Sequence, residues 1–424
     1  MRRREAGGSD SPDEVIDVER LRESTAAAAR RSFEEMAAAG HLVEAPPLYA
    51  PAAPPQPPLL VAVPDGPGER LADAERLVAE NRHETALREL EGLWEHVHHA
   101  PALALRHRLA EAWALMYVGE LGRAGELLEQ AEMLVNSPRF EAADRGEVLF
   151  RRGALTLLRG DIAEATSLFT RALETNDRSP SPSRPLAARA HEWRSRCHQR
   201  QGSLEAAGRD AERSLELATL VGDDGLKARA LVQASLVAER QRQWLLARCY
   251  GEQALELCSR RGDLLSTARI LNNLGAILFL LGEIPAAERH LERAARTAAE
   301  AGSEADQAQA TSSLAQVYLR TDRPGEAREL ACAAAGSLVG RTDFLEELGN
   351  AELVAAKAFA AEQDTATAAV WLDRAEATFT KLGARNELAS VLVARGDLCR
   401  AAGDPDAAAD LYRQAAESLQ DVHF

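Results

Sequence analysis

The sequence predicts an all-α protein, a solenoid of nine antiparallel helix pairs. An alanine recurs at intervals of 38 to 42 residues throughout residues 69–424. Each of these alanines is preceded by a small residue twelve positions earlier, and most are preceded by a helix-breaking residue five positions earlier. Aromatic residues make up only 4% of the chain. Because sandwiches and barrels are rich in aromatic and β-branched residues, this composition argues against an all-β fold.

Residues 1–45 are expected to form a disordered tail that contains one candidate helix, Val15 to Ala39. The charges of this helix alternate in sign instead of forming a basic patch, so direct binding of nucleic acid by the tail is the weaker hypothesis. Residues 46–68 follow as a proline-rich linker, because nine of the 18 prolines lie within residues 46–67. Each proline removes a backbone donor and clashes with the preceding helical turn, so the linker should be extended.

Residues 69–424 then repeat one helix–turn–helix unit nine times. Small side chains at two places in each unit should let the two helix backbones approach closely. The recurring alanines are Ala86, Ala124, Ala165, Ala207, Ala247, Ala287, Ala327, Ala368 and Ala408. The small residues twelve positions before them are Ala74, Ala112, Gly153, Ser195, Ser235, Gly275, Ala315, Ala356 and Gly396.

The turn within each unit falls five positions before the recurring alanine. Helices end readily at glycine because it adopts left-handed backbone angles at low cost. The glycines at this position are Gly119, Gly160, Gly202, Gly282 and Gly403. Asn81 and Asp322 also suit a turn, whereas Arg242 and Gln363 do not. Seven positions after the recurring alanine, eight of the units have alanine or serine. The first unit departs most from the pattern, because it has Leu93 there.

Charge and cysteine usage exclude several classes of protein. The chain has 50 Lys and Arg against 66 Asp and Glu, a net charge of −16, which disfavours sequence-independent binding of nucleic acid. It has no run of about 18 apolar residues, so no membrane span is expected. Its five cysteines form no C-x-x-C pair. Such scattered cysteines favour reduced thiols, so we expect a cytoplasmic protein.

No motif for catalysis or for cofactor binding is present. The sequence lacks a P-loop, a G-x-G-x-x-G turn after a strand and an EF-hand loop. Four histidines near the end of the first unit could hold a metal, but solvated histidines are common at such a helix end. They are His96, His98, His99 and His107. The sequence therefore predicts no enzyme, no cofactor and no metal site.

The spacing within each unit resembles the tetratricopeptide repeat. The turn follows the first small residue by seven positions, the recurring alanine follows the turn by five, and another small residue follows that alanine by seven. The resemblance covers residues 69–424. The period of about 40 exceeds the 34 usual for that family. Stretches such as Gly262-Asp263 and Leu271-Asn272-Asn273-Leu274-Gly275 resemble its long-repeat branch, found in kinesin light chains and bacterial peptide-sensing regulators. The resemblance implies a right-handed superhelix whose inner wall is formed by the first helices.

In that family the second, sixth and ninth positions of the first helices build a peptide-binding groove. Carried to this chain, these positions and their neighbours in units four to seven give Arg189, Trp193, Arg196, Arg229, Gln233, Arg269, Asn273, Gln309, Ser313 and Gln316. Amides can pair with a peptide backbone and guanidinium groups with carboxylates. The alternative is that these are ordinary solvated positions. The family's carboxylate clamp of Lys and Asn is not reproduced, so the resemblance does not imply a C-terminal carboxylate ligand.

Two functions follow from the resemblance. The first is a non-enzymatic scaffold or adaptor that binds an extended protein or peptide segment, with an acidic segment favoured by the arginines. The second is a bacterial signalling or transcriptional regulator, in which the repeats sense a peptide or protein and act through residues 1–45 or a separate DNA-binding partner. No polar capping helix follows the last repeat, so that repeat is also a candidate surface for a homodimer.

Overall fold

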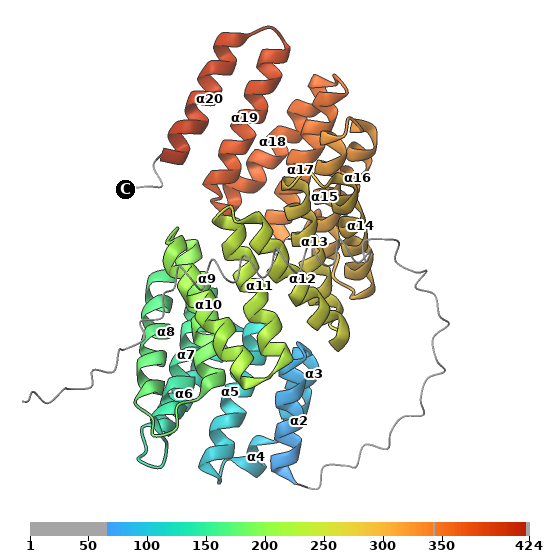
Figure 1. Cartoon of the computed structure of the whole chain (residues 1–424). Coiled ribbons are helices and arrows are strands. Elements are labelled where there is room, and N and C mark those ends of the chain that lie inside the picture. The colour runs from blue at the N-terminus through green and yellow to red at the C-terminus, as the bar shows by residue number, and fades with distance from the viewer. Residues whose placement is uncertain (1–65, 342–343, 421–424) are drawn as a thin grey trace, which may run out of the picture. The chain divides into compact units, whose positions relative to one another are not determined.

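The computed structural model describes residues 66–341 and 344–420, which form helices joined by short turns with no β-strand among them (Figure 1). The candidate helix at Val15 to Ala39 and nearly all of the proline-rich linker lie outside these residues. None of the described helices is long and apolar enough to cross a membrane.

Eighteen of the described helices form nine antiparallel pairs, which confirms the predicted solenoid. The first helices are α2 (Pro67–Ala79), α5 (Pro101–Tyr117), α7 (Ala142–Leu158), α9 (Arg184–Arg200), α11 (Asp224–Arg240), α13 (Leu264–Leu280), α15 (Glu304–Arg320), α17 (Leu345–Ala361) and α19 (Arg385–Ala401). The second helices are α3 (His83–Leu90), α6 (Leu121–Val135), α8 (Ile162–Asp177), α10 (Leu204–Val221), α12 (Trp244–Arg261), α14 (Ile284–Glu300), α16 (Pro324–Leu338), α18 (Thr365–Leu382) and α20 (Pro405–Gln420). The short helix α4 (Trp94–Val97) follows α3.

The first pair is irregular, because α3 and α4 together take the place of one longer helix. Gly92 has a φ of 71° and interrupts the helix just before Leu93. Leu93 is fully buried, in a cluster with Leu71 and Leu90. The irregularity therefore falls where the sequence departs most from the repeated pattern.

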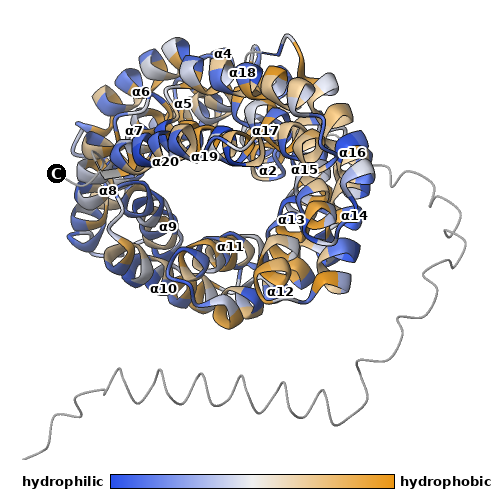
Figure 2. Cartoon of the chain, turned by 90° about the horizontal axis from the view of Figure 1, so that it is seen from above, coloured by the Kyte–Doolittle hydropathy of each residue, from blue (hydrophilic) through white to orange (hydrophobic). Residues whose placement is uncertain are grey.

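Successive pairs stack side by side, with the first helices turned inward. Seen from above, α9, α11, α13 and α15 lie on the inner side, and α10, α12, α14 and α16 lie outside them (Figure 2). The surface that α9, α11, α13 and α15 turn inward is called the inner wall below. Because equivalent residues recur every 40 or so positions, they form rows that run across neighbouring helices of this wall.

The small residues set the spacing of the helices. All nine recurring alanines are at most 2% exposed. A Cβ atom added to Gly275 would lie 2.5 Å from Cγ of Leu291, and one added to Gly396 would lie 2.5 Å from a ring carbon of Tyr412. In both pairs a large side chain of the second helix therefore fills the space that a side chain on the glycine would need.

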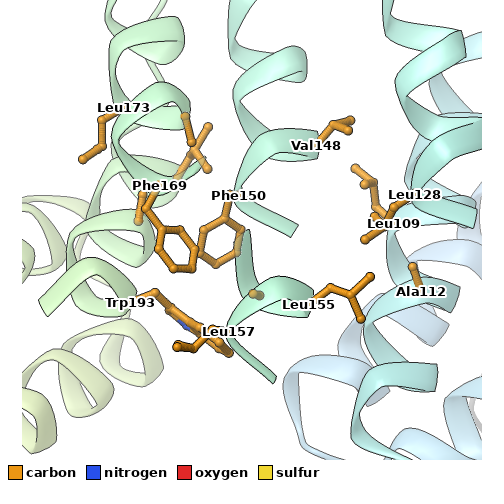
Figure 3. Packing of buried hydrophobic residues seen from close by; sticks show 14 of the residues in the cluster. Leu109, Ala112, Leu128, Val148, Phe150, Leu155, Leu157, Phe169, Leu173 and Trp193 are labelled. Carbon is orange, nitrogen blue, oxygen red and sulfur yellow. The ribbon is translucent and has the colours of Figure 1, made fainter. Parts of the chain in front are cut away.

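Buried apolar side chains fill the layers between neighbouring helices. In pairs two to four this core is rich in aromatic rings, with Phe150 and Phe169 fully buried (Figure 3). Their ring centroids are 5.8 Å apart, and the ring of Trp193 lies 6.1 Å from each of them. The core is thus a series of local layers, as expected when each repeat contacts only its neighbours.

The turn inside each pair has the same backbone geometry throughout the array. All nine turn positions have a positive φ, including Arg242 at 59° and Gln363 at 66°. Arg242 and Gln363, whose side chains do not favour this backbone, adopt it nevertheless. After Arg242, the amide of Gln243 donates to the carbonyl of Ala238 at 2.8 Å, which is the hydrogen bond that closes a Schellman turn. Packing of the two helices thus imposes the backbone angle, whichever residue occupies the position.

Replacing Arg242 with glycine is expected to raise the free energy of unfolding by about 1 kcal/mol, because a non-glycine residue in the left-handed region is strained. Gln363→Gly should act in the same direction. The matched control is Gly282→Ala, which introduces this strain at an equivalent turn and should lower stability by a similar amount. Denaturant titration of the three variants measures the effect. An unchanged midpoint for Arg242→Gly would show that the turn carries no strain.

Candidate functional site

The ten residues proposed for the groove lie on four consecutive first helices but differ in exposure. Arg229, Arg269, Gln309 and Gln316 are exposed, and four others are partly buried: Arg189, Arg196, Asn273 and Ser313. The remaining two, Trp193 and Gln233, are buried. Their spacing of about one repeat places Arg189, Arg229, Arg269 and Gln309 in one row along the inner wall.

Trp193 belongs to the aromatic core and offers little surface to a ligand. The residue is 6% exposed and lies against Phe150 and Phe169 (Figure 3). Its ring lies 5.5 Å from that of Trp113, in an edge-on arrangement. The guanidinium group of Arg196 lies over its ring, 5.1 Å from the centroid. The buried ring of Trp193 thus packs against the guanidinium group of Arg196, an arginine of the inner wall.

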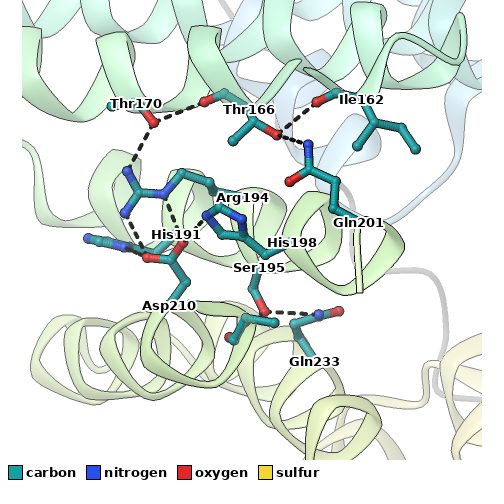
Figure 4. A network of polar contacts seen from close by, with 11 residues as sticks. Ile162, Thr166, Thr170, His191, Arg194, Ser195, His198, Gln201, Asp210 and Gln233 are labelled. Carbon is teal, nitrogen blue, oxygen red and sulfur yellow. Dashed lines mark hydrogen bonds and ion pairs between the residues drawn. The ribbon is translucent and has the colours of Figure 1, made fainter. Parts of the chain in front are cut away.

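Gln233 is also buried, and its side chain is hydrogen-bonded within the protein. It is 1% exposed, and its amide nitrogen donates to Ser195 Oγ at 3.1 Å (Figure 4). The same nitrogen donates to Gln199 Oε1 at 3.2 Å. Ser195 in turn donates to the carbonyl of Ala207 at 2.8 Å. These bonds join α11 to α9, so Gln233 holds two neighbouring repeats together.

Arg189 is bound to a carboxylate of the preceding repeat. Its two terminal nitrogens donate to the two oxygens of Glu147 at 3.1 and 2.7 Å. Arg151 also donates to Glu147, at 3.0 Å, and its guanidinium lies 4.2 Å from the centroid of Trp113. Although burial alone would raise the pKa of Glu147, the charges and hydrogen bonds of the two arginines lower it to about 2. Glu147 therefore stays ionised, and Arg189 is saturated by it.

Arg269 makes the equivalent bond to the following repeat. Its Nε and Nη2 atoms donate to the two carboxylate oxygens of Asp306 at 2.8 and 3.1 Å. Asp306 is held in place by Ser303, whose hydroxyl donates to it at 2.6 Å. The Arg269 side chain is well exposed, but its hydrogen-bonding edge faces a protein carboxylate.

Arg229 differs from these two arginines. Its only close partner among the described residues is Glu192, whose Oε2 lies 3.6 Å from Arg229 Nε, too far for a hydrogen bond. Glu192 is 1% exposed, and its other oxygen accepts from Arg196 at 2.6 Å. Across the part of the chain that the structure describes, Glu192 Oε2 has no hydrogen-bond donor. Arg229 thus keeps unused donors on the inner wall.

Four polar residues of the candidate set also keep their hydrogen-bonding groups unused by described protein atoms. They are Asn273, Gln309, Ser313 and Gln316. They lie on α13 and α15, next to Arg229 on α11. Arg229 and these four residues are therefore the part of the predicted groove that can form new hydrogen bonds without breaking existing ones.

The carboxylates that bind the inner-wall arginines were not predicted from the sequence. Glu192 stands four positions before Arg196 on one helix, a spacing that signals an ion pair. Asp306 gives no such local signal, because it lies 37 residues from Arg269 on another helix. Glu192 and Asp306 thus partly neutralise the positive charge of the inner-wall arginines.

A second polar network lies behind the inner wall, between α8, α9 and α10. Asp210 accepts from His191 Nδ1 at 2.7 Å and from two nitrogens of Arg194 at 2.7 Å each (Figure 4). Arg194 also donates to the hydroxyl of Thr170 at 3.1 Å. Asp210 is 6% exposed. The network is therefore closed to ligands and ties three helices together.

Two of the histidines near the first pair, His98 and His99, have ring centroids 3.6 Å apart. The Nδ1 atoms of His96 and His98 lie 3.2 and 3.0 Å from backbone carbonyls of their own helical turn. His107 is 1% exposed, and its Nε2 lies 3.2 Å from the carbonyl of Leu90. Within residues 66–341 and 344–420, no group of three His, Cys, Asp or Glu side chains is placed to hold a metal ion.

A shallow hollow of about 370 Å³ lies away from the predicted groove. Residues of α12, α13 and α14 line it, including Thr267, Arg293, Arg296 and Glu300. It contains none of the ten candidate residues. Because it is open and its arginines share it with a carboxylate, it shows no enclosed site for a small molecule.

Comparison with known proteins finds a family match for part of the chain and a shared fold for most of it. Residues 266–335 match the family model described as tetratricopeptide repeat. No curated protein sequence matches the chain. Solved structures do match it: a Rap protein complexed with competence and sporulation factor has 14% identity and a TM-score of 0.63, with 84% of this chain and 98% of that one covered.

Two further structures agree. The apo form of the quorum sensor NprR from B. thuringiensis has 13% identity and a TM-score of 0.63, and the alignment covers 83% of this chain and 98% of that one. A signal transduction ATPase with a tetratricopeptide repeat sensor, from Pyrococcus horikoshii, has 14% identity and a TM-score of 0.56, with 81% and 54% covered. At these identities the likeness concerns the fold. The nine stacked helix pairs thus share the fold of these structures, and residues 266–335 match the tetratricopeptide repeat.

Proposed function

We propose that the chain is a non-enzymatic adaptor that binds an extended peptide or protein segment along the inner wall of α11, α13 and α15. The observation that carries the proposal is the row of side chains with unused hydrogen-bonding groups: Arg229, Asn273, Gln309, Ser313 and Gln316. An extended segment has a free N–H and C=O at every residue, and side-chain amides can bond to both.

The structural relatives support this proposal. The Rap protein of similar fold was solved with competence and sporulation factor bound. A repeat array presents the same kind of side chain at regular intervals along its wall, which suits a partner with a regular backbone.

Changing Asn273, Gln309 and Ser313 together to alanine is expected to weaken capture of the partner about 100-fold. Each lost hydrogen bond contributes about 1 kcal/mol, and none of the three side chains bonds to described protein atoms, so stability should hold. Affinity purification from a lysate of the source cells, followed by mass spectrometry, measures the loss for each captured protein.

The matched control changes Gln253 and Arg289 to alanine, because these exposed residues lie on the outer helices α12 and α14. It should capture the same proteins as the unchanged chain. If the inner-wall variant also captures them undiminished, the wall is not the binding surface.

The alternative function is that of a regulator whose repeats sense a peptide or protein. The quorum sensor NprR has a similar array, which supports this alternative. The output would then pass through residues 1–45 or a separate DNA-binding partner. A DNA mobility-shift assay on the full chain and on residues 46–424 separates these routes, because a shift that needs residues 1–45 supports direct output. Pairing of two chains through α19 and α20 remains a prediction, which light scattering tests.

A further inference from the structure

Arg189, Arg229 and Arg269 occupy matching places on α9, α11 and α13 but differ in their contacts. Arg189 and Arg269 each bind both oxygens of a carboxylate on a neighbouring repeat. Such bidentate pairs use the edge of the guanidinium group that recognises carboxylates. Arg229 makes no hydrogen bond to a described residue, and its side chain is 47% exposed. It is the member of this row that remains able to bind a carboxylate of a partner.

A buried carboxylate positions Arg229 together with a second arginine. Glu192 lies beneath both, with its Oε1 bonded to Arg196 at 2.6 Å and its Oε2 3.6 Å from Arg229. The Arg196 side chain is 38% exposed and the Glu192 side chain only 1%. Two guanidinium groups therefore reach the inner wall over one hidden negative charge, which leaves one unit of positive charge at this point.

The surroundings strengthen the interaction of this charge with a ligand. Arg196 lies over the buried ring of Trp193, so one side of the pair faces aromatic side chains instead of water. A charge that is partly shielded from water attracts an opposite charge more strongly.

We propose that Arg229 and Arg196 together bind one aspartate or glutamate side chain of the segment that the inner wall captures. This inference rests on the proposed peptide-binding function and adds the chemical class of the partner at one position. The single unit of net positive charge matches a carboxylate. A phosphorylated side chain carries a charge of about −1.5 to −2, so the second negative charge would face the carboxylate of Glu192 without compensation.

Affinity selection with a defined peptide library tests the assignment. The full chain is immobilised and offered end-blocked decapeptides that carry glutamate, glutamine or phosphoserine at one central position, with the other positions randomised. Glutamate peptides should be retained about tenfold more than glutamine peptides, since a hydrogen bond between charged groups has about this effect on affinity.

Arg229→Gln should abolish the preference for glutamate while the chain still retains peptides through the amide row. Arg269→Gln is the matched control, because it removes an equivalent arginine that is already bonded to Asp306. It should keep the preference. Arg229→Lys retains the charge without the planar edge and should show an intermediate preference, which separates loss of charge from loss of fold.

The outcomes separate the two proposals. Retention of peptides with no preference for glutamate, or a preference that persists in Arg229→Gln, overturns the carboxylate site and leaves peptide binding standing. A preference for phosphoserine overturns the carboxylate site in favour of a phosphate site. If the unchanged chain retains no peptide of any class, both proposals fail.

Discussion

Asp210→Asn is expected to lower the free energy of unfolding by about 3 kcal/mol, because it leaves a partly buried arginine without its carboxylate. Arg194 makes two hydrogen bonds of 2.7 Å to Asp210 and is 20% exposed, so water cannot replace the lost partner fully. His191 loses its acceptor at the same time. Because the network joins α8, α9 and α10, the variant should loosen the layer between repeats three and four.

The effect of Asp210 should depend on pH in a defined direction. Burial alone would raise its pKa from 3.8, but the hydrogen bonds from Arg194 and His191 lower it to about 2. A carboxyl group whose pKa is lowered by folding stabilises the native state above its unfolded pKa, and this stabilisation is lost as the pH falls through the folded value. The difference between the two values corresponds to about 2 kcal/mol. The difference in the free energy of unfolding between the unchanged chain and the variant should therefore decrease as the pH falls from 4 to 2.

Denaturant midpoints at pH 7, 4 and 2.5 measure both effects. Asp373→Asn is the control, because Asp373 also pairs with an arginine, Arg395, but its side chain is 68% exposed. An exposed ion pair contributes less than about 1 kcal/mol, so this variant should change little. If the two variants lost the same free energy of unfolding, burial of the Asp210 network would not contribute to stability.

Gly275→Leu is expected to lower the free energy of unfolding by about 3 kcal/mol or more, because overpacking a close helix contact forces the backbones apart. Even a Cβ atom at this position would lie 2.5 and 2.6 Å from Cγ and Cδ2 of Leu291, well inside contact distance. The collision occurs between α13 and α14, within one pair. Hydrogen exchange followed by mass spectrometry should show the loss of protection there and in the adjacent repeats first.

A second glycine provides the control. Gly336 lies inside α16, and an added Cβ atom would meet no atom within 4 Å. Gly336→Ala should therefore raise stability by up to about 1 kcal/mol through the backbone entropy of the unfolded chain. If both substitutions moved stability in the same direction, the contact of Gly275 with Leu291 would not determine the spacing of the pair.

The fold was predictable because its signal is repeated. One small residue carries little information, but two small residues at a fixed offset in all nine units, and a third in eight of them, define the register. The backbone at Arg242 and Gln363 was not predictable from these residues, since their own preference is overridden by the helices on either side. Packing and the closing hydrogen bond override the conformational preference of a residue when both favour the same backbone angles.

The inner wall was less predictable because its chemistry depends on pairs of residues distant in sequence. Position alone placed Trp193 and Gln233 in the groove, but neighbouring repeats bury both. Arg189 and Arg269 look alike in sequence to Arg229, and their partners Glu147 and Asp306 lie about one repeat away in opposite directions. Which arginine stays unbonded is therefore decided by the stacking of repeats. The assignment of the wall to a ligand stays a prediction.

The uniform turns also make the array modular. Gly202 and Arg242 occupy equivalent left-handed positions 40 residues apart. Excision of residues 203–242 would join two equivalent turn ends and remove one complete repeat in register. Gain or loss of whole repeats in evolution can thus lengthen or shorten the wall in steps of one first helix. Such a step changes the sequence of side chains that the wall presents and leaves the type of every helix contact as it was.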